Sequence, residues 1–319
     1  IFQIERVAIF AFEFLGVDIQ PLSIIRNRTM NPKKYLLFGA LLSLLSFFCL
    51  ASTNALVKLL NDQIPVFQIL FLQNMIGVLV LVLICVYQRR PLSFYKSEHY
   101  GLLFSRSVGG LGAFFFIFIS VKYISVTNAT LLLNTAPLFI PFILFFLFAE
   151  KINHQLWAGI APGFIGIALI LNPSASIFQW HALLPIISGL CMAALYIVLR
   201  QLHFYKESML RVLLYLFLCA ALITLPMGAY TWQNPTSHEW MLLLLISLCS
   251  FLSQSLITFS LRYGSPAALA PLCYTSVIFA LGYDWFIWHN IPSWLSLFGI
   301  VLVIAGGITA LCIEARLKN

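Results

Sequence analysis

Charged residues are scarce in this sequence, and their scarcity argues against a soluble protein. Aspartate, glutamate, lysine and arginine make up 9% of the 319 residues, whereas soluble proteins contain about 25%. Apolar residues make up 61% and come in runs of about 18 to 24, long enough to cross a bilayer core about 30 Å thick as helices. The sequence therefore predicts an all-α polytopic membrane protein rather than a soluble protein with an unusually apolar core.

The motifs of common catalytic and metal-binding sites are also missing. There is no GxxxxGK[ST] phosphate loop, no GxSxG elbow and no HExxH pair. The seven cysteines stand singly in apolar runs, and no histidine pair has the spacing of metal ligands. We therefore expect no enzyme, no metal and no cofactor, and any uphill transport must draw on an ion gradient or on exchange. The net charge of +8 lies in loops, which argues against a nucleic-acid partner.

Ten apolar ranges are predicted to be transmembrane helices, because a backbone in lipid must satisfy its own hydrogen bonds. Residues 1–34 are expected to form an N-terminal extension, cytoplasmic or interfacial, and residues 314–319 a cytoplasmic tail. The approximate limits of the ten spans are 35–58, 65–87, 99–121, 124–148, 155–172, 179–199, 208–230, 239–261, 265–288 and 292–313.

Lysine and arginine predict the orientation, since cytoplasmic loops carry an excess of both. With a cytoplasmic N-terminus, the outer loops and span ends hold only Lys58 and Lys122. The asymmetry predicts that both termini are cytoplasmic, in an inner, plasma-type membrane. The residues that would then lie inside are Lys33, Lys34, Arg89, Arg90, Lys96, Lys151, Arg200, Lys206, Arg211, Arg262, Arg316 and Lys318.

The chain repeats itself, so residues 35–172 and 179–313 are expected to be two five-helix units. A unit with an odd number of spans must lie inverted relative to its copy, and inverted repeats are typical of transporters with a site near the midplane. The charges agree, because Lys58 and Lys122 fall outside while their counterparts Arg200 and Arg262 fall inside. The positions that match at an offset of 140 include Ser120 and Ser260, Tyr123 and Tyr263, Thr135 and Thr275, Gly159 and Gly299, and Gly166 and Gly306.

Several short motifs resemble the drug/metabolite transporter superfamily, EamA type. They are Arg106-Ser-Val-Gly-Gly, then Val121-Lys-Tyr-Ile-Ser-Val-Thr-Asn-Ala-Thr, Ala136-Pro-Leu-Phe and the closing Glu150. The resemblance covers roughly residues 36 to 313, including the duplicated layout. It implies a secondary carrier for small polar metabolites such as amino acids, working by alternating access around a central cavity.

The chain departs from the family pattern at three places. The second copy has Val277 where the first has Pro137, and Asn290 where the first has Glu150. Members often carry an arginine in the second span, where this chain has Gln73-Asn74.

Two charged residues inside spans are candidates for function, because lipid penalises charge. Arg106 lies several residues into the third span and would anchor an anion or carboxylate; a structural arginine that holds carbonyls near the inner surface is the alternative. Asp284, in the ninth span, is a candidate for proton coupling. The alternative for Asp284 is an interfacial aspartate in an aromatic belt beside Tyr283 and Trp285.

The fourth span is predicted to carry a polar cavity wall and a hinge. Pro137 and Pro141 lack an N–H, so the carbonyls four residues earlier lose their helical partner. These prolines are the expected hinge, and Asn134 and Thr135 beside them are expected to bind substrate, as are their repeat counterparts Tyr274 and Thr275. The other substrate-binding candidates are Asn54, Asn74 and Gln254, followed by Gln73, Tyr196 and Tyr215.

The sequence thus predicts a transporter of a small polar metabolite, such as an amino acid or its derivative, moved outward or by exchange. Its expected partners are the small-molecule substrate and the lipid bilayer, and a homodimer is left open. Two rival functions remain at this point. An integral-membrane enzyme acting on lipid-linked substrates would need clustered catalytic residues at one membrane face, and a non-transporting scaffold would need no polar central cavity.

Overall fold

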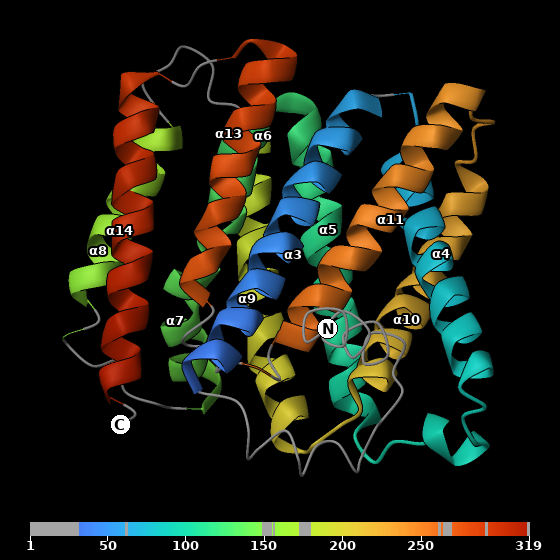
Figure 1. Ribbon diagram of the computed structural model, residues 1–319. Coiled ribbons are helices and arrows are strands. Elements are labelled where there is room, and N and C mark those ends of the chain that lie inside the picture. The colour runs from blue at the N-terminus through green and yellow to red at the C-terminus, as the bar shows by residue number, and fades with distance from the viewer. Residues whose placement is uncertain are drawn as a thin grey trace.

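The computed structural model describes residues 32–60, 63–148, 155, 157–171, 180–260, 263, 270–290 and 293–317. Every regular element within those ranges is helical (Figure 1). In chain order the elements are α3 (Pro32–Leu60), α4 (Val66–Tyr87), η1 (Leu92–Tyr95), α5 (Tyr100–Tyr123), α6 (Val126–Leu133), α7 (Ala136–Phe148), α8 (Trp157–Leu171), η3 (Trp180–Leu183), α9 (Leu184–Phe204), α10 (Met209–Tyr230), α11 (Ser237–Ser260), η4 (Ala270–Tyr274), α13 (Thr275–Trp288) and α14 (Trp294–Leu317).

Each predicted span coincides with one helix or with two consecutive helices. Shorter apolar helices accompany five longer ones, and the predicted count of ten crossings stays a prediction. Most of the expected N-terminal extension, residues 1–31, lies outside the described residues, as does the end of the tail, 318–319. The five helices that are long and apolar enough to cross a membrane are Leu37–Leu60, Val66–Tyr87, Tyr100–Tyr123, Met209–Tyr230 and Ser237–Ser260.

The helices pair across the two predicted halves of the chain. Helix α3 packs on α11, α4 on α10, α5 on α9, α6 on α13 and α8 on α14. The α3–α11 pair is antiparallel, because Ser46 of α3 donates a hydrogen bond to the Ser253 carbonyl while Gly39, nearer the start of α3, faces Tyr263. Each helix of one half therefore has its principal neighbour in the other half.

Apart from the buried Arg106, the described cations lie near two opposite ends of the bundle. Lys58 and Lys122 lie at the ends of α3 and α5, where their Nζ atoms donate to the carbonyls of Ile124 and Ile64, 3.0 and 3.1 Å away. The start of α3 and the end of α14 lie together on the opposite side (Figure 1). The assignment of either end to the cytoplasm stays a prediction.

Helices α8 and α14 approach each other closely at Gly166. A methyl group added there would lie 2.7 Å from the carbonyl oxygen of Gly299 and 2.9 Å from the amide nitrogen of Val303. Backbone atoms cannot rotate away, so Gly166→Ala is expected to separate the helices and to lower the unfolding free energy by about 1–3 kcal/mol. Thermal unfolding in detergent measures the change.

Gly282→Ala in α13 is the matched control for this substitution. No atom lies within 4 Å of the methyl group that it would add, and alanine favours a helix over glycine by about 0.5–1 kcal/mol. Gly282→Ala should therefore unfold at the wild-type temperature or above it. Equal unfolding temperatures for the two variants would contradict the close packing at Gly166.

Candidate functional site

Two helices are interrupted at equivalent positions of the predicted repeat. Helix α6 ends at Leu133 and α7 begins at Ala136, while η4 gives way to α13 between Tyr274 and Thr275, 140 residues later. At each break a threonine hydroxyl donates a 2.6 Å hydrogen bond to the carbonyl three residues earlier, Thr135 to Leu132 and Thr275 to Leu272. The two copies therefore share a local bond as well as a sequence pattern.

Pro137 explains the position of the first break. Proline lacks an N–H, so the carbonyl four residues earlier, at Leu133, has no helical partner, and the turn falls at Asn134 and Thr135. The side chains of Pro137 and Pro141 lie outside what the structure describes, and their role as a hinge stays a prediction.

Asn134 joins the two breaks to each other. Its Nδ2 donates to the carbonyl of Cys273, 3.2 Å away, and to the hydroxyl of Ser276, 2.6 Å away. Gly189 of α9 packs against the same turn, because a methyl group at Gly189 would lie 2.9 Å from the Thr135 hydroxyl. The first break is therefore held against the second half of the chain by a buried amide and by close contact with α9.

Asn54 and Tyr274 bring unpaired polar atoms to this region. Asn54 of α3 donates from Nδ2 to the Thr130 hydroxyl of α6, 3.3 Å away. Its Oδ1 and the Tyr274 hydroxyl are both buried, with no hydrogen-bond partner among the described residues. Buried polar atoms are usually paired, so unpaired ones mark places where water or a ligand can bind.

A pocket lies between α4, α5, α10 and α11. Its polar lining comes from Gln73 and Asn74 of α4 and from Ser250 and Gln254 of α11. The Gln73 Oε1 and the Ser250 hydroxyl are buried without a partner in the described part of the chain. The apolar lining is Gly110, Leu111, Phe114, Leu216, Phe217 and Ala220. Three predicted residues, Gln73, Asn74 and Gln254, therefore meet in one pocket.

Arg106 adjoins this pocket and is almost completely buried, at 1% exposure. It precedes Gly110 by one helical turn on α5, and its Nη2 donates to the hydroxyl of Thr258, 3.3 Å away and one turn beyond Gln254 on α11. Tyr196 of α9 lies close enough to interact with it electrostatically. The Nε and Nη1 atoms have no hydrogen-bond partner among the described residues.

Asp284 caps a helix rather than facing this pocket. Its carboxylate, 1% exposed, accepts hydrogen bonds from the N–H groups of Val126 and Thr127, 3.2 and 2.7 Å away, at the start of α6. Lys58 lies 3.8 Å from it and also stacks over the ring of Trp288. The burial differs from the interfacial alternative, and proton coupling by Asp284 stays a prediction.

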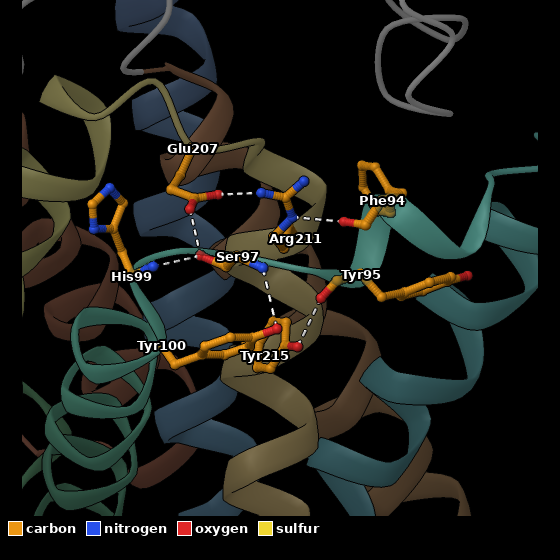
Figure 2. Close-up of polar contacts among 8 residues, drawn as sticks. All are labelled: Phe94, Tyr95, Ser97, His99, Tyr100, Glu207, Arg211 and Tyr215. Carbon is orange, nitrogen blue, oxygen red and sulfur yellow. Dashed lines mark hydrogen bonds and ion pairs between the residues drawn. The ribbon is translucent and has the colours of Figure 1, made fainter.

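A polar network that we call the loop latch fastens the segment after α4 to the start of α10 (Figure 2). Arg211 donates from Nε to the Phe94 carbonyl and pairs through Nη1 with Glu207, both at 2.7 Å. Ser97 donates to the other Glu207 oxygen, and Tyr215 donates to the Tyr95 carbonyl, 2.9 Å away. Tyr215, predicted to face a central cavity, is thus part of the loop latch.

A smaller contact, which we call the amide clasp, fastens the opposite ends of the same two helices. Gln68 Nε2, at the start of α4, donates to the carbonyl of Gln233 after α10, 2.8 Å away. The Gln233 N–H donates back to Gln68 Oε1, 2.9 Å away. Gln68 is the third residue of α4 as Arg211 is the third residue of α10. The amide clasp and the loop latch therefore fasten opposite ends of α4 and α10.

Sequence reasoning missed several of these residues. Ser250 and Thr258 share the inner face of α11 with Gln254 at spacings of four, a serine–threonine stripe that could have identified them. Gln233 and Glu207 gave no signal, because loop polar residues are usually solvated, and Gln68 lies at the end of a predicted span. The predicted substrate-binding residues fall into two groups, one around the pocket and one around the helix breaks. In the described part of the chain, no three metal-ligating side chains gather.

Known proteins resemble this chain over most of its length. A pseudopaline exporter of Pseudomonas aeruginosa is 26% identical over 274 residues, covering 85% of this chain and 94% of that protein. An S-adenosylmethionine uptake transporter of Rickettsia bellii is 26% identical over 264 residues, which cover 82% of this chain and 89% of that protein. A protein of known crystal structure, 18% identical, covers 90% of this chain and 99% of its own with a TM-score of 0.59, which indicates a shared fold.

These features define a membrane transporter of a small molecule, and the named relatives are transporters rather than enzymes. The profile of the EamA-like transporter family matches residues 37–172 and again residues 179–311. The chain therefore belongs to the EamA-like transporter family. This confirms the family, the membrane class and the non-enzymatic function that the sequence predicts.

Proposed function

We propose that the protein is a secondary transporter that moves a small polar metabolite by alternating access between two inverted five-helix halves. One observation carries the proposal: the pocket is shared equally between the halves. Helices α4 and α5 of residues 35–172 form one side of it, and α10 and α11 of residues 179–313 form the other. A site on such a seam changes its exposure when one half rocks against the other.

The helix pairing supports the inverted arrangement. Exchanging the two halves turns the α3–α11 pair into the α9–α5 pair and leaves the α4–α10 and α8–α14 pairs as they are. The α4–α10 pair is antiparallel, since Gly77 faces Phe217 while Gly228 faces Phe71. A two-fold axis lying in the membrane plane produces this set of pairs. The two matches of the family profile agree with a duplicated unit.

The two end contacts provide gates for alternating access. The loop latch holds one end of α4 and α10, and the amide clasp holds the other. Opening one contact while the other stays closed would expose the pocket to one side only. This is the arrangement that a carrier needs and that a static scaffold does not.

The substrate is proposed to be an amino acid or an amino-acid derivative, exported or exchanged. S-adenosylmethionine, carried by the Rickettsia relatives, contains the amino and carboxylate groups of methionine. The relative from Pseudomonas is an exporter. The proposed binding residues are those around the pocket and the breaks, with Asp284 as the candidate for proton coupling and Pro137 and Pro141 as the hinge. We propose an inner membrane with both termini cytoplasmic, and a homodimer remains open.

Transport by cells and by proteoliposomes tests the proposal. Metabolites in the cells and the medium are compared with and without the protein, and those that change are tested for saturable counterflow with the purified carrier. Gln254→Leu is expected to reduce this flux at least about tenfold, because a buried amide in the pocket is lost. Gln63→Leu removes an exposed amide outside the pocket and should leave the flux unchanged. Counterflow that is absent for every such metabolite would contradict transport.

A further inference from the structure

Arg106 carries a buried positive charge that the described protein does not neutralise. Within the described residues no carboxylate forms an ion pair with it, and the Thr258 hydroxyl is the one hydrogen-bond acceptor of its guanidinium there. Most of the five N–H donors of the guanidinium belong to Nε and Nη1, which lack partners among these residues. Buried charges in proteins are usually paired, because taking an isolated ion out of water is costly.

The two structural roles open to such an arginine do not fit this geometry. A snorkelling side chain keeps its charged group in water, but Arg106 is 1% exposed. An arginine that holds a helix end would donate to carbonyl oxygens, and in the described part of the chain Arg106 donates to a hydroxyl only. Neither role is therefore fulfilled among the described residues, and the guanidinium keeps N–H donors there that a ligand could use.

The neighbouring pocket is polar but contains no charge that could serve as that partner. Its polar side chains are the amides of Gln73, Asn74 and Gln254 and the hydroxyl of Ser250. Amide and hydroxyl groups bind neutral, positive and negative groups alike. Among the described residues here, Arg106 is therefore the one that gives the region a preference for ligands of one charge. That preference is for an anion.

We propose that Arg106 binds the carboxylate, or an equivalent anionic group, of the transported metabolite, while the rest of the metabolite occupies the pocket, which widens when one half rocks against the other. The inference rests on the proposed transport function and narrows its substrate class to molecules that bear such a group. Planar guanidinium matches planar carboxylate in shape and hydrogen bonding, and this pairing is strong where water is excluded. For an amino acid, the free Gln73 Oε1 is an acceptor for the ammonium group.

Arg106→Met is the decisive variant, since it keeps the bulk of the side chain and removes the charge. Flux of the metabolites exported by wild-type cells is expected to fall at least about a hundredfold, and Arg106→Lys should retain part of it, because a point charge remains. The purified Arg106→Met protein should unfold in nanodiscs, without added metabolite, at or above the wild-type temperature. Arg89→Met removes an exposed loop arginine and is expected to change neither flux nor unfolding.

The untargeted metabolome identifies the substrate class without a chosen probe. Every metabolite exported by wild-type cells but not by Arg106→Met cells should carry a carboxylate or another anionic group. A neutral metabolite in that set would overturn the inference. So would Arg106→Met protein that unfolds well below the wild type while Arg106→Lys does not, because that result assigns the charge a structural role.

Chloride is the alternative anion that could neutralise Arg106, and one further experiment distinguishes chloride from the metabolite. If chloride raises the unfolding temperature of the wild type but not of Arg106→Met, and flux requires chloride, the counter-ion is inorganic and the inference fails. Unchanged flux in Arg106→Met also overturns the inference and leaves the transport function intact. Absence of any wild-type flux, by contrast, is the failure of the proposed function.

Discussion

Replacing Asp284 with alanine is expected to destabilise the protein by about 3–5 kcal/mol, the range found when one partner of a buried ionic contact is removed. The carboxylate is 1% exposed and accepts from the N–H groups of Val126 and Thr127. These are among the first N–H groups of α6, which have no partner inside the helix and lie at its positive end. Thermal or chemical unfolding in detergent measures the loss.

Lys58 allows the contributions to be separated. It retains the Ile124 carbonyl and the Trp288 ring when Asp284 is removed. Lys58→Met should therefore cost less than Asp284→Ala, because the two N–H bonds to the carboxylate survive. A double-mutant cycle over both residues gives the coupling of the pair itself. If Asp284→Ala and Lys58→Met were equally destabilising, the ion pair rather than the helix cap would be the main interaction.

Asp284→Asn separates this structural role from proton coupling. Asparagine keeps an oxygen that can accept one of the two N–H bonds, but its own NH₂ group faces the other, so intermediate stability is expected. If Asp284 acts only as a helix cap, the folded fraction of the Asp284→Asn protein should transport with the same pH dependence as the wild type. A stable variant whose flux no longer depends on pH would instead identify Asp284 as the coupling residue.

Asp284 also illustrates what the sequence can and cannot predict. The helices follow from apolar runs and short polar connections, which are local properties, and the predicted spans agree with the structure to within a few residues. The cap joins Asp284 to residues 157 and 158 positions earlier. No periodicity within a span encodes a partner at that separation. The sequence therefore singled out Asp284 as a candidate but did not predict its role as a helix cap.

The helix breaks were the most predictable part of the candidate site. A missing proline N–H acts on a carbonyl four residues away, so its effect at the first break is local. The second break has Val277 in place of Pro137, so only the repeat, and not a proline, indicates its position at Thr275. The bond from Asn134 to Ser276 and the bond from Arg106 to Thr258 span 142 and 152 residues. These depend on how the two halves pack, which residue types alone do not determine.

Breaking the loop latch is expected to give the largest change in access to the pocket. Hydrogen bonds that involve a charged group contribute about 1.5–3 kcal/mol each, and Arg211 makes two of them, to Glu207 and to the Phe94 carbonyl. Arg211→Met loses both. Since each 1.4 kcal/mol changes a population tenfold, the pocket should open at the latch end at least about tenfold more often.

Ser250→Cys provides a reporter that needs no known substrate. Ser250 lines the pocket and is 1% exposed, and cysteine differs from serine by one atom. With the seven native cysteines replaced by alanine, a membrane-impermeant thiol reagent is added to vesicles of either orientation. Arg211→Met should accelerate labelling from the latch end, and the charge pattern predicts that this end is cytoplasmic. Lys96→Met, an exposed neighbour, is the control.

The amide clasp gives the opposite prediction and completes the test. Gln68→Leu removes two neutral hydrogen bonds to Gln233, which contribute about 0.5–1.5 kcal/mol each. It should accelerate labelling of Ser250→Cys by a smaller factor, and from the other side. Acceleration of both variants from the same side would mean that the two contacts do not gate opposite ends, and the alternating mechanism would have to be abandoned. Because the loop latch is charged and the amide clasp is neutral, the two contacts differ in strength, so the unliganded carrier should open more readily at the clasp end.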